Sequence, residues 1–226
     1  MDLKNDERIE QLGLNGLKII QSSNLYRFTS DAVLLTKFAS AKKNDVVADF
    51  CAGSGIVGLH FYALNPSCVK SVDAFELQPA LADMCERTVE LNGLQEKFKV
   101  HNVAIQEISN EFNGKFSLIL CNPPYEKPDS GEKSLSESDR IARHEIAVTL
   151  KEIVTAAAKN LKYGGRLCMA HRADRLVDVL CEMRANGLEP KRIKFISAKD
   201  KAPYLMFAEG VKGGKPCVKI EPQFYN

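Results

Sequence analysis

Residues 46–58 read Val46-Val-Ala-Asp-Phe-Cys-Ala-Gly-Ser-Gly-Ile-Val-Gly58 and decide the fold of this chain. They run from an apolar segment, typical of a buried strand, through a glycine-rich turn into the start of a helix. Gly53 and Gly55 let the backbone approach a ligand closely, and Gly58 lets the helix pack tightly on the sheet. The stretch therefore predicts an α/β fold with a ligand at the glycine turn.

Two acidic residues near this turn distinguish between possible ligands. The glycine spacing also matches a dinucleotide-binding fingerprint, and Glu76 ends the next predicted strand, where a ribose-binding acid belongs. An NAD enzyme is therefore one interpretation. Asp49, however, precedes the glycines, where its charge would repel a pyrophosphate. S-adenosylmethionine carries no phosphate and has an ammonium group, so Asp49 favours this cofactor.

A second apolar run, 116–121, ends in Asn122-Pro123-Pro124-Tyr125. Two prolines remove backbone donors and end the strand, so this turn presents its carbonyls outward. The Asn122 side-chain oxygen and the Pro123 carbonyl can then accept both hydrogens of one NH2 group, freeing the nitrogen lone pair from an aromatic ring. Tyr125 offers a flat face on which a base can stack. The motif indicates in-line methyl transfer to a planar nitrogen such as adenine N6, although a plain Pro-Pro turn is the alternative.

Strands and helices alternate along the rest of the chain, as a doubly wound α/β sheet requires. We predict one domain over residues 41–226, preceded by a cap at 1–40 that falls outside this pattern and leads into the cofactor pocket. Seven strands are expected, at 46–49, 71–76, 97–103, 116–121, 166–170, 191–197 and 204–209. Helices are expected at 79–92, 146–161 (ended by Tyr163-Gly164-Gly165) and 174–186.

At this point the chain resembles the class I S-adenosylmethionine-dependent methyltransferases and, within them, the bacterial tRNA1(Val) adenine N6-methyltransferase family. That family modifies the adenine immediately 3′ of the anticodon, adenine 37. The stretches that carry this narrower resemblance span about residues 12 to 222: Ile20-Gln21, Tyr26-Arg-Phe28-Thr-Ser-Asp31-Ala-Val-Leu-Leu35, Glu76-Leu-Gln78-Pro79, Glu90-Leu-Asn-Gly93, Ala142-Arg-His144-Glu145 and Lys212-Gly-Gly-Lys215-Pro216.

The resemblance implies a Rossmann-like, mostly parallel sheet whose last strand is inserted antiparallel. It also implies tRNA as the substrate and S-adenosylmethionine as the cofactor. The residues that it assigns to the cofactor, together with those argued above, are Phe28, Asp31, Asp49, Cys51, Gly53, Gly55, Glu76, Leu77, Ala104, Ile105 and Asn122. The residues expected to act on the target amine and base are Asn122, Pro123, Pro124 and Tyr125.

Two positions depart from the pattern of the family. Cys51 stands where the first glycine of the turn is usual, and it can be accommodated if its φ angle stays negative. Ala104 stands where related enzymes place an Asp that binds the cofactor adenine. Recognition of this adenine then falls to backbone groups around Ala104 and Ile105, or to Asn102.

Composition agrees with a cytoplasmic enzyme. The 226 residues are 45% hydrophobic, enough for one buried α/β domain, and the chain shows neither a long apolar span nor the apolar core of a signal peptide. Its seven cysteines include no Cys-x-x-Cys pair, so we expect neither disulfides nor a metal site. Cys51 and Cys121 flank the predicted site, but methyl transfer from a sulfonium needs no thiol nucleophile. No obligate protein partner is evident.

Charge is distributed unevenly along the chain. Residues 1–150 carry a net −5 and residues 151–226 a net +7, which suits a polyanion against one side or, equally, solvated helix faces. The predicted RNA contacts are Arg140, Arg143, Arg172, Arg175, Lys212 and Lys215. The polar segment 126–139 either closes over a flipped adenine or is a passive loop.

Three other functions stay open. A protein glutamine N5-methyltransferase shares the Asn-Pro-Pro-Tyr motif, although 40 N-terminal residues leave little room for the helical domain that usually holds its protein substrate. The site alone also allows N6-adenine or N2-guanine methylation of DNA or ribosomal RNA. The third alternative is a non-catalytic RNA-binding protein, against which the intact motifs argue.

Overall fold

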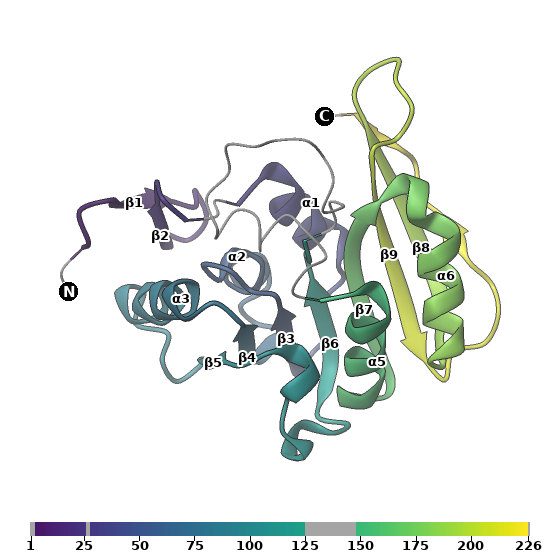
Figure 1. Cartoon of the computed structure of the whole chain (residues 1–226), viewed down its shortest axis with the longest axis horizontal. Coiled ribbons are helices and arrows are strands. Elements are labelled where there is room, and N and C mark those ends of the chain that lie inside the picture. The colour runs from purple at the N-terminus through teal and green to yellow at the C-terminus, as the bar shows by residue number, and fades with distance from the viewer. Residues whose placement is uncertain (1–2, 26–27, 125–147, 226) are drawn as a thin grey trace.

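A nine-stranded mixed sheet lies at the centre of the computed structural model, which describes residues 3–25, 28–124 and 148–225 (Figure 1). The strand order is β10-β8-β9-β7-β6-β3-β4-β5, with β11 also beside β8. The strands are β3 Asp45–Phe50, β4 Val69–Glu76, β5 Phe98–Asn102, β6 Phe116–Cys121, β7 Leu161–Arg172, β8 Leu188–Ser197, β9 Leu205–Lys212, β10 Lys219–Ile220 and β11 Phe224–Tyr225.

The predicted strand directions are confirmed. Strands β3 to β7 pair in parallel, and β9 lies between β7 and β8, antiparallel to both. All seven predicted strands are present, but the count is too low because the short strands β10 and β11 extend the sheet along β8. Their two-residue length and exposed side chains explain why periodicity does not reveal them.

Different helices cover the two faces of the sheet. Successive side chains of a strand point to opposite faces, so Leu118 and Leu120 of β6 pack with α1 and α2, whereas Ile119 and Cys121 pack with α5 and α6. This is the predicted doubly wound architecture. The helices are α1 Ser30–Phe38, α2 Ile56–Leu64, α3 Pro79–Leu91, α5 Leu150–Asn160 and α6 Leu176–Ala185, with short 3-10 turns η1 Ile105–Glu107, η2 Asn110–Phe112 and η3 Ala173–Arg175.

Two helices begin later than their sequence pattern predicts. Helix α5 starts at Leu150, after Thr149, whose hydroxyl accepts from the Glu152 backbone N–H while the Glu152 carboxylate accepts from the Thr149 N–H. This reciprocal capping sets the start of the helix. Residues 173–175 form η3 before α6. The expected helix stop at residues 163–165 instead lies within β7, which begins directly at Leu161.

The N-terminal residues contribute both a hairpin and a core helix. Strands β1 Glu7–Gln11 and β2 Lys18–Ser22 pair antiparallel outside the main sheet, and Ile20 packs on Leu81 and Met84 of α3. Helix α1, by contrast, buries Ala32, Leu35 and Phe38 in the core. Helix α1 therefore belongs to the core although its residues precede the recognised strand pattern, and the cap at residues 1–40 stays a prediction. No helix in the described residues is long and apolar enough to cross a membrane.

Candidate active site

The glycine turn after β3 has three residues in the left-handed backbone region. Cys51 has φ 58°, Gly53 has φ 57° and Gly55 has φ 87°. The expectation that Cys51 keeps a negative φ is therefore wrong, and its Cβ makes this conformation cost roughly 1–2 kcal/mol. A Cβ at Gly55 would lie 2.5 Å from the Cys85 sulfur. The turn thus needs glycine at residue 55 for space as well as for conformation.

Asp49 lies behind this turn and is fully buried. Its Oδ2 atom accepts from the Gly58 backbone N–H at 2.8 Å, whereas its Oδ1 atom has no hydrogen-bond partner among the described residues. Burial raises the pKa of Asp49 to about 7; the Gly58 hydrogen bond opposes this shift and the nearby Glu76 adds to it. An unpartnered buried carboxylate oxygen is costly by itself and suits a cationic ligand.

Glu76 joins the end of β4 to the glycine turn. Its two oxygens accept from the backbone N–H groups of Gly53 and Gln78, each at 2.8 Å. Burial nevertheless raises the pKa of Glu76. Asn102, at the end of β5, donates from its amide to the carbonyl oxygens of Glu76 and Leu77 at 2.8 and 2.9 Å. Asn102 therefore holds the Glu76 turn in place, and these two donors are not available to the cofactor adenine.

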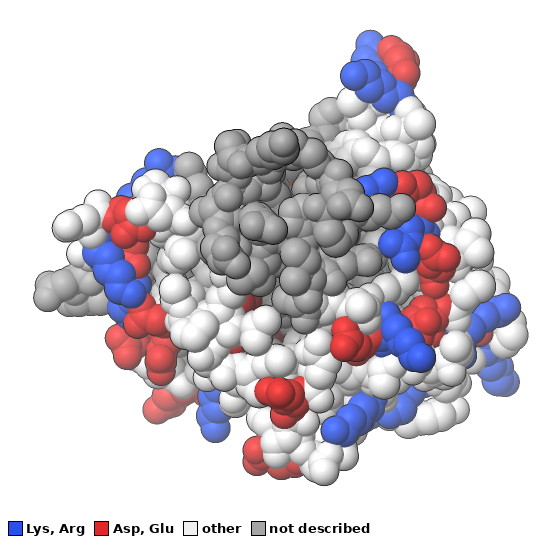
Figure 2. Space-filling model, viewed as in Figure 1, with Lys and Arg blue, Asp and Glu red and all other residues white. Residues whose placement is uncertain are grey.

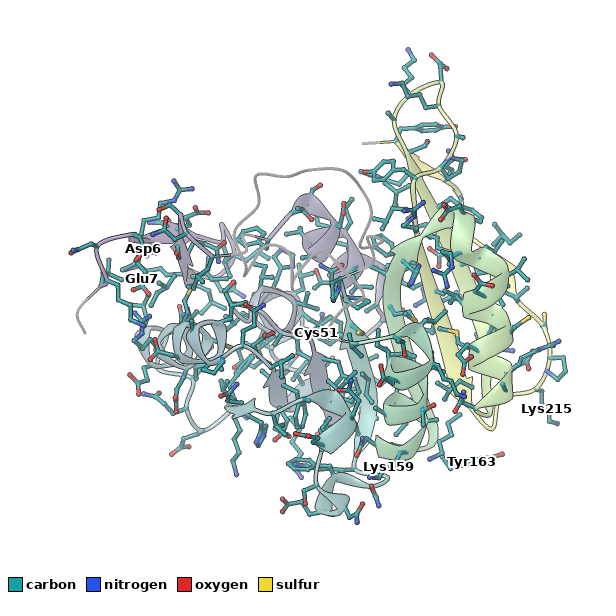
Figure 3. The ribbon with its side chains drawn as sticks, in the orientation of Figure 1. Asp6, Glu7, Cys51, Lys159, Tyr163 and Lys215 are labelled. Carbon is teal, nitrogen blue, oxygen red and sulfur yellow. The ribbon has the colours of Figure 1, made fainter. Side chains whose placement is uncertain are left out.

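One pocket brings most of the predicted site residues together. Its lining includes the predicted residues Phe28, Cys51, Gly53, Glu76, Leu77, Ala104, Ile105, Asn122 and Pro124. The labelled Cys51 marks its place near the ends of β3 and β6 (Figure 3). Asp31, Asp49, Gly55 and Pro123 do not belong to the lining that the described residues form. Asp49 is buried behind the turn, and Gly55 forms part of the turn.

The pocket also contains polar residues that the sequence pattern did not single out. Ser54, Gln78 and Gln106 contribute to its lining. Ser54 accepts from the Gln21 amide at 2.7 Å, which connects the turn to β2. Ser54 lies within the glycine turn and Gln78 lies two residues after Glu76, so their positions could have identified them as site residues. Gln106 lies in the short 3-10 turn η1 after β5, and no sequence motif marks it.

The Asn-Pro-Pro turn lies at the carboxyl end of β6, beside the glycine turn. Register pairs Phe50 with Cys121, so Asn122 follows β6 where Cys51 follows β3. The Asn122 Oδ1 atom is buried and has no hydrogen-bond partner within residues 3–25, 28–124 and 148–225. Tyr125 and the segment 126–139 lie outside the described residues, so their predicted roles stay predictions. An acceptor without a partner in a ligand pocket is suited to bind an N–H group.

The thiol of Cys121 is not a candidate nucleophile. Cys121 is fully buried, and burial, together with its neighbour Cys51, raises the pKa of this thiol well above the usual value. A thiol that stays protonated at neutral pH is a poor nucleophile. No cluster of His, Cys, Asp and Glu that could hold a metal ion occurs in the described part of the chain.

The predicted RNA contacts lie at two opposite ends of the strands of the sheet. Arg172, at the carboxyl end of β7, pairs with Asp174, and Arg175 pairs with Asp178 at 2.5 Å. Lys212 lies at the opposite end of the strands, near the start of β7. Its ammonium donates to the Ala158 and Leu161 carbonyls at 2.6 and 2.7 Å. The two groups of positive charges therefore lie apart, and their role in RNA binding stays a prediction. Arg140 and Arg143 lie outside the described residues.

The sequence profile of the methyltransferase small domain family matches residues 29–180. The chain belongs to the methyltransferase small domain family. Residues 29–180 extend from α1 to α6 and include the glycine turn, Glu76 and Asn122, so the matched region contains nearly the whole pocket. The protein is thus an S-adenosylmethionine-dependent methyltransferase, as its sequence predicted.

Named relatives cover most of this methyltransferase. A protein of Shewanella frigidimarina named tRNA1(Val) (adenine(37)-N6)-methyltransferase is 26% identical over 178 residues, 76% of this chain and 70% of that protein. A protein of the same name from Yersinia pestis is 27% identical over 140 residues, 62% of this chain and 55% of that protein.

Solved structures resemble the methyltransferase in fold. A tRNA m1G37 methyltransferase from M. jannaschii has a TM-score of 0.65 at 16% identity, covering 94% of this chain and 59% of that one. TYW2 from M. jannaschii in complex with AdoMet has a TM-score of 0.64 at 14% identity, covering 93% and 87%. At such identities the likeness concerns the fold alone.

Proposed function

We propose that this enzyme transfers the methyl group of S-adenosylmethionine to N6 of an adenine in tRNA, namely adenine 37 of tRNA1(Val). The observation that carries the proposal is the unpartnered Asn122 Oδ1 atom, which belongs to a residue lining the same pocket as Glu76 and the glycine turn. An amine bound to this oxygen would lie next to the cofactor. The names of the relatives support the choice of adenine and of tRNA.

The residues of the pocket fit the proposed cofactor. When bound, S-adenosylmethionine supplies a methyl group on a positively charged sulfur. The unpartnered Asp49 Oδ1 atom lies beneath the glycine turn and compensates positive charge, and Glu76 accepts from the ribose hydroxyls. A Cβ at Gly53 would meet no atom within 4 Å, so this residue leaves open space next to its backbone. Leu77 and Ile105 offer apolar surface to the adenine, and backbone groups near Ala104 read its edge.

Asn122 and Pro123 prepare the target amine in this proposal. The exocyclic nitrogen of adenine is a weak nucleophile because its lone pair is delocalised into the ring. If Asn122 Oδ1 accepts one hydrogen and the Pro123 carbonyl the other, the nitrogen is held pyramidal and its lone pair points at the methyl group. Positioning of this kind contributes on the order of 7–11 kcal/mol in well-aligned reactions. The proton leaves after transfer, when the nitrogen carries positive charge, so a dedicated base is not required.

The RNA substrate must present its adenine unstacked, since the amine is not accessible within a helix. Tyr125 is proposed to stack on the flipped base, with Arg140 and Arg143 nearby in sequence. Arg172 and Arg175 lie on the same side of the sheet as Asn122, at the carboxyl ends of the strands, because β7 runs parallel to β6. Their aspartate partners leave both guanidinium groups partly exposed for phosphates.

A substrate-pool assay tests the proposal. The protein is incubated with radiolabelled cofactor and, separately, with tRNA, ribosomal RNA, DNA or release factor, and the methylated product is mapped by mass spectrometry. We expect label only in tRNA, as N6-methyladenine at position 37 of tRNA1(Val). Label in glutamine of the release factor, or in DNA, would contradict the proposal and favour the corresponding alternative. Asn122→Ala serves as the inactive control.

A further inference from the structure

Five lysines lie at the end of the strands that is opposite the active site. We call Lys159, Lys162, Lys191, Lys212 and Lys215 the lysine patch; they come from the end of α5, the start of β7, β8, the end of β9 and the segment that follows β9. Two contacts join these segments: the Lys191 ammonium donates to the Lys215 carbonyl at 3.0 Å, and the Lys212 ammonium donates to the Leu161 carbonyl at 2.7 Å. Figure 3 shows the labelled Lys159, Tyr163 and Lys215 in a row along the lower margin, from below the centre to the far right.

The charge of the lysine patch is not balanced within the described part of the molecule. None of its five ammonium groups forms an ion pair with a carboxylate of a described residue. Glu189 lies in β8 close to Lys191, but it is paired with Arg184 at 2.8 Å. Figure 2 shows Lys and Arg side chains along the same lower right margin. Neighbouring like charges repel, so this arrangement suits a polyanion.

Lys212, like Lys191, has a structural contact that Lys159, Lys162 and Lys215 lack among the described residues. Its ammonium donates to the Ala158 and Leu161 carbonyls at the end of α5, which is where a cation stabilises a helix. Lys159, Lys162 and Lys215, by contrast, are exposed at the surface. These three side chains are therefore the ones that an external ligand can reach.

An exposed aromatic ring lies among these lysines. Tyr163 is 80% exposed, and its hydroxyl donates to the Gly213 carbonyl at 3.2 Å. A Cβ at Gly213 would lie 2.1 Å from the Tyr163 ring, so glycine is what lets the ring lie against this turn. A solvent-facing ring bordered by lysines combines a stacking surface with phosphate-binding charges, as nucleic-acid sites do.

The distance from the active site restricts the possible ligands. Leu161 pairs with Phe116 at the start of β6, and Met169 pairs with Cys121 at its end, next to Asn122. Because the register shifts after Leu161, the separation is set by the five residues of β6 from Phe116 to Cys121, which correspond to about 17 Å. A single nucleotide in the pocket cannot reach so far, whereas a tRNA can. We propose that the lysine patch binds the phosphate backbone of the substrate tRNA outside its anticodon stem-loop, an inference that rests on the proposed function.

The test compares two triple variants with the same change in charge. Lys159→Gln, Lys162→Gln and Lys215→Gln are combined in one protein, and Lys43→Gln, Lys70→Gln and Lys97→Gln, which are also exposed and without ion pairs in the described residues, form the control. Affinities for whole tRNA1(Val) and for its isolated anticodon stem-loop are measured from 50 to 300 mM salt. Cofactor affinity and methylation of both RNAs are measured in parallel.

We expect the patch variant to bind whole tRNA at least tenfold more weakly near physiological salt. Its plot of log affinity against log salt should be less steep by roughly 2–3, because each lost phosphate contact removes about 0.7–0.9 from the slope. Binding of the stem-loop and of the cofactor should match the wild type, and the control variant should bind whole tRNA normally.

Three outcomes would overturn the inference: an unchanged salt slope for whole tRNA, an equal loss in the control variant, or an equal loss for the stem-loop. The first would point to another acidic partner, and the third would place the patch at the anticodon. Failure of the wild-type protein to methylate either RNA would instead contradict the proposed function. Normal methylation with an unchanged slope would contradict only the lysine patch.

Discussion

The Oδ2 atom of Asp49 accepts a hydrogen bond from the backbone N–H of Gly58 at 2.8 Å. This contact ties the end of β3 to the first turn of α2. It depends on the missing side chain of Gly58, because a Cβ there would lie 3.2 Å from this oxygen and 3.1 Å from Val72. The carboxylate is thereby held between sheet and helix with its second oxygen unpartnered in the described residues.

Cofactor affinity should increase with pH. Burial raises the pKa of Asp49 to about 7, so near pH 6 most of the free protein carries a neutral carboxyl group. A cationic cofactor favours the ionised form, and binding must then release a proton. Calorimetric titration from pH 5.5 to 8.5 should show affinity rising until the pH exceeds about 7. In Asp49→Asn the affinity should be lower and nearly independent of pH; an equally pH-dependent mutant would assign the effect to another group.

The contribution of Asp49 to the stability of the free protein should decrease as pH rises from about 4 to 7. The folded-state pKa of Asp49 lies above the value of 3.8 for an exposed Asp, so the unfolded chain ionises first and gains stability relative to the folded state. A difference of one between the folded and unfolded pKa corresponds to about 1.4 kcal/mol, so the part of the stability that is lost through Asp49 approaches roughly 4 kcal/mol above pH 7. Urea unfolding of wild type and Asp49→Asn at several pH values measures this. Relative to the wild type, the mutant should become more stable as the pH rises over this interval.

Asn122→Ala should lower kcat by about 10² to 10³, the usual effect of removing one positioned polar group at a reacting centre. Affinity for the cofactor should change little, because the cofactor's proposed polar contacts come from Asp49, Glu76 and the glycine turn. Single-turnover kinetics and cofactor titration separate the two effects. Asn122→Asp keeps one acceptor in place and should retain partial activity. A near-normal rate in Asn122→Ala would mean that the motif is only a turn.

Cys51→Gly should stabilise the protein by about 1 kcal/mol. The left-handed conformation at φ 58° is unfavourable for a residue with a Cβ and free of this cost for glycine, although glycine gives back part of the gain through its greater freedom in the unfolded chain. Thermal unfolding at constant pH measures the change. Cys51→Val, which adds a branched Cβ, is the opposing control and should lower the stability.

Asn102→Ala should weaken cofactor binding several-fold without abolishing methyl transfer. Its amide holds the carbonyls of Glu76 and Leu77, and their release would let the Glu76 carboxylate move away from the Gly53 turn. Because Asn102 does not belong to the described lining of the pocket, the effect should appear in KM for the cofactor rather than in kcat. A fall in kcat with unchanged KM would instead indicate direct contact with the reaction.

The local order of elements could be predicted from the chain alone. The apolar runs before Cys51 and Asn122, the glycines of the turn and the two prolines restrict backbone conformation within a few residues, and such restrictions act without distant partners. For this reason the central strands, their alternation with helices and the pair of loops at the site followed from the sequence. Register Phe50–Cys121 then placed the two loops side by side.

The roles of individual side chains were decided only by the tertiary structure. Asn102 uses its amide on carbonyls 25 and 26 residues away, and Lys212 uses its ammonium on carbonyls 51 and 54 residues away, so no local pattern could reveal either. The same holds for the unpartnered oxygen of Asp49 and for the separation of Arg172 from Lys212 across the sheet. Hydrogen bonding and burial depend on which distant segments meet, and these contacts exist only once the sheet has assembled.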